Sequence, residues 1–189
     1  MKIKFWPHLG AALLGSVLLS ACQSAPPHSP PEPERWQATR NNCYSLLHQL
    51  LDQEKDVSKL RFIKHEDANL KNLLKKVSDA SRAAAAHLEL FAKDDPALAL
   101  EEYRLPAGEK MTRDSISAAE QNELLKSSGD QLEMILILTQ VEALNYASHL
   151  AKVAAENDLQ PERARYLKGL SHEMSVLHEE VIGQLSLRR

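Results

Sequence analysis

The sequence is short of the residues that build covalent and metal frameworks. Its 189 residues include only 2 cysteines, which are too few for a disulfide scaffold, a zinc ribbon or an iron–sulfur cluster. The 6 glycines and 9 prolines exclude collagen-like and low-complexity chains. Beyond residue 22, no apolar segment approaches the ~20 residues that are needed to cross a bilayer.

The charge balance lacks the excess of one sign that a nucleic-acid-binding protein needs. The chain has 23 basic and 26 acidic residues and a formal net charge of -3, whereas phosphate neutralisation calls for a basic stripe. Its hydrophobic fraction of 43% is too high for a disordered chain. We therefore expect one globular domain with extensions, and no nucleic acid among its partners.

Residues 1–22 (MKIKFWPHLGAALLGSVLLSAC) have the three-part layout of a secretory signal. Lys2 and Lys4 precede an apolar run from Leu9 to Leu19, and two small residues then precede Cys22. The run is shorter than a membrane-spanning helix. We expect residues 1–21 to be a signal peptide.

The four residues Leu19-Ser20-Ala21-Cys22 resemble the lipobox of bacterial lipoproteins. In that family the cysteine sulfur is diacylated, the chain is cleaved before the cysteine, and the new amino terminus is acylated. The resemblance implies that membrane lipid is a partner through acylated Cys22, because two or three acyl chains give stable attachment. Gln23 follows the cysteine where an Asp would favour retention in the inner membrane, so the resemblance implies the outer membrane, with the protein facing the periplasm.

Residues 22–35 are expected to be a tether that carries the lipid. Five of the nine prolines lie between residues 23 and 35, and proline favours an extended, polyproline-like chain that would reach about 40 Å. A softer, disordered tail of similar reach is the alternative.

Residues 36–189 are expected to form a helical domain. Residues 34–95 contain no glycine or proline, as is typical of helices. Along the first helix, a set of residues recurs alternately four and three positions apart, which places them on one helical face; we call this set the first apolar track. It includes two polar residues, Arg40 and Glu54. Its apolar members are Trp36, Cys43, Leu47, Leu50 and Val57. This spacing slips near Val57, which predicts a turn between Asp56 and Ala68 with Asp67 as the N-cap of a second helix.

The remaining sequence predicts a connection, a short helix and two more long helices. The connection covers Lys93–Arg113, which lacks a sustained period. Asp114 or Ser115 can cap a helix to about Lys126. The long helices are expected over Asp130–Asn157 and from Pro161 to about Leu187.

Four long amphipathic helices of similar length predict an all-α fold, a four-helix bundle with a long connection between the second and third long helices. A long crossover in that position is a feature of ferritin-like bundles. An up-down-up-down bundle with a decorated loop is the alternative.

A ferritin-like layout raises the possibility of a carboxylate-bridged metal site, which needs Glu-x-x-His pairs. No Glu or Asp is followed three residues later by His, and no two histidines are four residues apart. A noncanonical site would draw on Glu142 and His149, which share a helical face, and on His172 and Glu179. We favour the interpretation that these are ordinary helix residues, and expect no metal or other cofactor.

One further residue and one further segment are expected to lie in the core. Cys43 falls on the first apolar track, and a lone exposed thiol would risk intermolecular disulfides in the periplasm. Met134–Leu138 is a run of five apolar residues; we expect it to be buried, with a partner surface as the alternative.

The sequence carries no nucleophile elbow, catalytic cysteine signature or glycine-rich phosphate loop. We therefore expect a protein that is not an enzyme: a lipid-anchored helical protein of the cell envelope, of structural or interaction type, with another envelope protein as partner. The alternatives are a ferritin-like metal-binding or redox bundle, and a pilotin-like accessory role in assembly.

Overall fold

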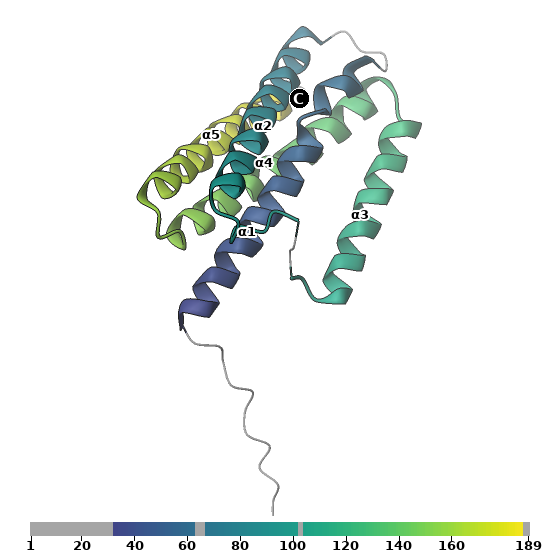
Figure 1. The fold of residues 1–189 in the computed structure, drawn as a ribbon. Helices are drawn as coiled ribbons and strands as arrows, with labels where there is room; N and C mark the ends of the chain where they lie inside the picture. The colour runs from purple at the N-terminus through teal and green to yellow at the C-terminus, as the bar shows by residue number, and fades with distance from the viewer. Residues whose placement is uncertain (1–31, 63–66, 102–103, 187–189) are drawn as a thin grey trace, which may run out of the picture. The chain divides into compact units, whose positions relative to one another are not determined.

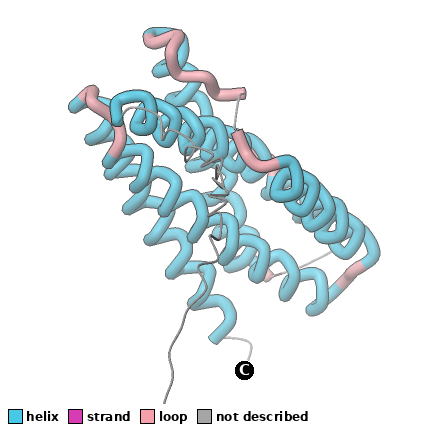
Figure 2. Tube along the Cα trace, turned by 90° about the horizontal axis from the view of Figure 1, so that it is seen from below, coloured by secondary structure: helices cyan, strands magenta, loops and turns pink. Residues whose placement is uncertain are grey.

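The computed structural model describes residues 32–62, 67–101 and 104–186 (Figure 1). The predicted signal peptide, Cys22 and the predicted tether as far as residue 31 lie outside this part of the chain. The described residues form helices and loops, with no strand (Figure 2). The elements are α1 (Glu32–Glu54), the 3₁₀ helix η1 (Val57–Phe62), α2 (Ala68–Asp94), α3 (Ala107–Lys126), α4 (Gly129–Glu156) and α5 (Pro161–Ser186).

The turn between the first two long helices lies where the sequence predicts it. Helix α1 ends at Glu54, and η1 follows before α2 begins. The side chain of Asp67 accepts hydrogen bonds from the backbone N–H groups of Asn69 (2.8 Å) and Leu70 (3.2 Å). Asp67 is therefore the N-cap of α2, as predicted, and satisfies two donors that the first helical turn leaves free.

Helix α1 begins earlier than expected, at Glu32. It thus includes residues 32–35, which the sequence analysis assigned to the tether. Pro33 is the second residue of the helix, and proline is tolerated in a first turn because the N–H that it lacks would be unpaired there.

Helix α3 is longer than the short helix that the sequence predicts. It begins at Ala107, whereas the prediction placed a connection there and a cap at Asp114 or Ser115. Lys110 forms an ion pair with Asp114, and Arg113 forms one with Glu109. In each pair the residues are four positions apart and the N···O distance is 2.7 Å. Such surface pairs favour a helix without giving it an apolar period, which is why the pattern of apolar residues did not indicate it.

The start of α5 was predicted correctly, and α4 begins one residue before the predicted Asp130. Gly129 is the first residue of α4 and has a φ of 61°, a left-handed conformation that glycine adopts without strain. Pro161 is the first residue of α5, with Glu162 beside it in the first turn.

Four helices pack side by side, and α3 lies apart. Helix α1 contacts α2 and α4, and α5 contacts the same two helices. Helices α1 and α5 run in one direction, and α2 and α4 in the other (Figure 1). Helix α3 connects the end of α2 to the start of α4 and makes few contacts, chiefly with α4.

The core consists of the apolar stripes of these four helices. The largest fully buried apolar side chains are Tyr44, Leu47, Leu51, Val77, Leu88, Ile137, Leu144, Leu167, Met174 and Val181. Cys43 is buried, as predicted, and burial raises the pKa of its thiol. Trp36, near the start of α1, is 46% exposed although it falls on the predicted apolar track.

The expected burial of the segment Met134–Leu138 is correct for only part of it. Leu136 and Ile137 are buried, whereas Met134 and Leu138 are 38% and 48% exposed. A helix turns every 3.6 residues, so five consecutive residues cover its whole circumference and cannot all face the core. Within the described residues, no helix is both long and apolar enough to cross a membrane.

Candidate functional site: a cleft beneath helix α3

The residues that the sequence analysis weighed as metal ligands are all at the surface. Glu142, His149, His172 and Glu179 are exposed. Among the residues that the structure describes, no three His, Cys, Asp or Glu side chains lie close enough together to hold a metal ion. The fold therefore does not assemble a ligand set from these candidates. Cys22, the predicted lipidation site, lies outside the described residues.

One buried polar cluster ties the chain together around Asp158, in the loop between α4 and α5. Its Oδ2 accepts hydrogen bonds from the Tyr44 hydroxyl (2.6 Å) and from Nε of Arg163 (2.8 Å). Its Oδ1 accepts from Arg163 (2.9 Å) and from the backbone N–H of Gln160 (2.8 Å). Arg163 also donates to Asp95, just after α2, over 3.0 Å.

This cluster is structural, because its hydrogen-bonding groups are paired. Burial alone would raise the pKa of Asp158, but the hydrogen bonds from Arg163 and Tyr44 hold that pKa below its ordinary value. The pKa of Tyr44 is raised, first by burial and then by its hydrogen bond to Asp158. The three residues join α1 and α5 to the loop before α5.

A hollow of about 440 Å³ lies between three parts of the fold: α1 with η1, α3, and α4. We call this hollow the α3 cleft. Its apolar wall is formed by Val57, Leu124, Leu125, Leu132 and Leu136.

The cleft exists because α3 packs loosely. No residue of α3 is buried, and Met111, Ile116 and Leu125 are 71%, 52% and 72% exposed. Since α3 inserts no apolar stripe between its neighbours, it covers α1 and α4 without filling the space beneath it.

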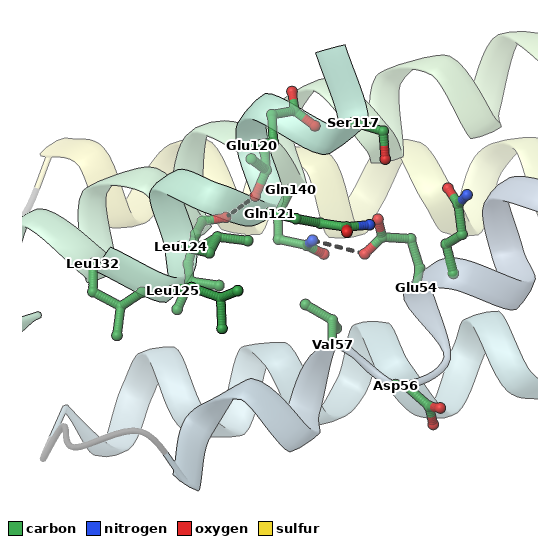
Figure 3. A pocket seen from close by; sticks show the side chains of 13 residues that line it. Glu54, Asp56, Val57, Ser117, Glu120, Gln121, Leu124, Leu125, Leu132 and Gln140 are labelled. Carbon is green, nitrogen blue, oxygen red and sulfur yellow. Dashed lines mark hydrogen bonds between the residues drawn. The ribbon is translucent and has the colours of Figure 1, made fainter. Parts of the chain in front are cut away.

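The opposite end of the α3 cleft carries a carboxylate paired with an amide. Nε2 of Gln140 on α4 donates a 2.7 Å hydrogen bond to Oε2 of Glu54 at the end of α1 (Figure 3). Gln140 is only 2% exposed, and its Oε1 has no hydrogen-bond partner among the described residues. A buried oxygen without a partner is costly, so Oε1 is an acceptor whose hydrogen-bonding capacity is unused.

The electrostatic environment of this end is acidic. Burial raises the pKa of Glu54 to about 6; the hydrogen bond from Gln140 lowers it, and the charge of Glu120 adds to the increase. The pKa of Glu120 is itself raised, mainly by burial and further by Glu142 and Glu123. Glu54, Asp56 and Glu120 line the cleft, and none of the described residues that line it is basic.

Two smaller hollows continue the cleft toward the start of α3. They have volumes of about 360 and 180 Å³, and Arg113 and Tyr146 line both. The Arg113 guanidinium donates to the Tyr146 hydroxyl (3.0 Å) and to Glu109 (2.7 Å), and lies 5.1 Å from the centre of the Tyr146 ring. Arg113 is thus paired with Glu109 and Tyr146, and it lines the larger of these two hollows together with Glu54.

No family model, curated protein or solved structure is significantly similar to this chain. The function must therefore be argued from the residues themselves.

The sequence analysis did not identify the α3 cleft as a site. One signal was present: Glu54 is a polar residue on the apolar track of α1. A carboxylate in a core-facing position indicates either a paired structural charge or a functional one. Its partner Gln140 lies 86 residues away in the sequence, so only the packing of α1 against α4 brings the two together.

Proposed function

We propose that this protein is a lipid-anchored helical protein of the bacterial cell envelope, which acts by binding another envelope component and not by catalysis. The observation that carries the proposal is the sequence of residues 1–22, in which a basic start, an apolar run and the lipobox-like Leu19–Cys22 occur in the order of a lipoprotein signal. Acylated Cys22 would hold the protein on the outer membrane, facing the periplasm.

The finer architecture belongs to the same proposal. We infer a four-helix bundle of α1, α2, α4 and α5, in which α3 forms part of a ferritin-like crossover between α2 and α4. The pairwise contacts of these helices and the common direction of α2 and α4 support it (Figure 1). Resemblance in topology carries no chemistry by itself, and the described residues offer no ligand set that would favour a metal-binding role.

The anchor is tested by substituting its cysteine. We expect the wild-type protein to incorporate labelled palmitate and to sediment with outer membranes, and Cys22→Ser to lose both properties. The matched control is Cys43→Ser. Because Cys43 is buried in α1, we expect it not to be acylated, so this variant should be labelled to the same extent as the wild type. Acyl labelling that persists in Cys22→Ser would contradict the proposal.

The choice of membrane has a separate test. Gln23→Asp should move the acylated protein to the inner-membrane fraction without changing its labelling. An unchanged distribution would remove the argument for the outer membrane while leaving the anchor intact.

A further inference from the structure

We propose that the α3 cleft binds a small organic cation with an apolar chain, whose ammonium or guanidinium group donates hydrogen bonds to Glu54 and Gln140 while its chain packs on the leucines of α3 and α4. The proposal concerns a binding activity of the helical domain and does not depend on the lipid anchor.

The size and the walls of the cleft suit a small molecule. Its volume of about 440 Å³ lies within the ~300–1,000 Å³ typical of small-molecule sites, which combine apolar walls with a few placed polar groups. Leu124, Leu125 and Leu132 lie at one end, and the Glu54–Gln140 pair lies at the other (Figure 3). A ligand with one apolar part and one polar part matches this division.

The polar end requires a hydrogen-bond donor. Gln140 is 98% buried, and its Oε1 lacks a partner among the described residues, while Nε2 of the same amide already serves Glu54. A ligand head group with several N–H donors has enough donors for both the unpaired Oε1 of Gln140 and the carboxylate of Glu54. An ionised carboxylate ligand has no donor for Oε1, and any anionic ligand would be repelled by Glu54.

The charge of the cleft favours a cation over a neutral donor. The lining contains Glu54, Asp56 and Glu120, with no basic side chain among the described residues that form it. In Figure 3 the carboxylates of Asp56 and Glu120 point away from the Glu54–Gln140 pair. Glu54 is therefore the carboxylate that a bound cation would contact, and the other two strengthen the attraction from a greater distance.

The test compares three probes that share a six-carbon chain and differ in the head group: n-hexylammonium, 1-hexanol and hexanoate. Binding to the purified full-length protein is followed by NMR on the side-chain amide of Gln140. We expect saturable binding of n-hexylammonium with a shift of that amide, weaker binding of 1-hexanol, and no binding of hexanoate.

Two variants locate the contact. Glu54→Gln keeps the shape of the side chain and removes its charge, and we expect the affinity for n-hexylammonium to fall about tenfold while that for 1-hexanol changes little, since one charge-assisted hydrogen bond is lost. Ser117→Phe on α3 should obstruct the cleft and weaken both probes. The matched control is Glu156→Gln, an exposed carboxylate on α4 that does not line the cleft.

Three outcomes would overturn the proposal. The first is n-hexylammonium binding no tighter than 1-hexanol, and the second is equal binding to the wild type and to Glu54→Gln. The third is binding of a lysine-containing amphipathic peptide by a protein that ignores n-hexylammonium, which would make the cleft a protein-docking groove.

Discussion

Glu54 should make the stability of the folded protein depend on pH in a direction opposite to most carboxylates. Its pKa in the folded protein is raised from its ordinary 4.5 to about 6. The folded state therefore holds the Glu54 proton more tightly than the unfolded state does. Between these two pKa values the folded state binds more protons, so the free energy of unfolding falls as the pH rises.

The size of this effect follows from the shift. Each pKa unit corresponds to 1.36 kcal/mol, so a rise from 4.5 to about 6 amounts to about 2 kcal/mol of stability lost between roughly pH 4 and pH 7. Because Glu54 is only partly buried, this figure is an upper bound. Glu54→Gln removes the titration, so the variant should gain up to this amount relative to the wild type over the same pH range.

Urea unfolding followed by circular dichroism, repeated at a series of pH values, measures this difference. The wild type and the variant share the cluster around Asp158, whose lowered pKa gives the opposite slope, so its contribution cancels in the comparison. The matched control is Glu156→Gln, which replaces an exposed carboxylate of α4 by an amide. A difference for Glu54→Gln that is flat, or that shrinks as the pH rises, would refute the burial of Glu54 beneath α3.

The structure makes two more predictions about stability. Tyr44→Phe should lower the free energy of unfolding by about 1.5–3 kcal/mol, because it removes a 2.6 Å hydrogen bond to the ionised Asp158; the loss should be measurable in urea near neutral pH and should disappear as the pH falls through the lowered pKa of Asp158. A loss that is independent of pH would mean that the hydroxyl does not act through that charge. In hydrogen exchange followed by mass spectrometry, α3 should exchange faster than α5, because no residue of α3 is buried whereas α5 includes a buried stripe; equal protection of the two helices would show that α3 packs more tightly than described.

Much of the helical framework could be predicted from local signals. Asp67 was predicted to cap α2 and Pro161 to start α5, each from the backbone preference of its residue type, and the structure confirms both. The buried residues of α4 and α5 recur at helical spacing, since a regular helix returns the same face to the core every few residues.

The predictions were less accurate where the sequence has no such regularity. Helix α3 is stabilised by pairs such as Arg113 with Glu109 and has no apolar stripe to indicate its start. In the segment Met134–Leu138, composition alone could not show which residues face a neighbouring helix. The lipid anchor at Cys22 remains a prediction from the sequence.

The sequence by itself determined that most of the described chain is helical and where α2 and α5 begin, because these properties depend on residues a few positions apart. Only the tertiary structure decided that α3 stands away from α1 and α4, that Glu54 meets Gln140 beneath it, and that Asp158 is enclosed by Tyr44 and Arg163. The physical reason is that a cleft and a buried pair are formed by the space between helices. That space depends on how well distant surfaces fit each other, which no local pattern of residues specifies.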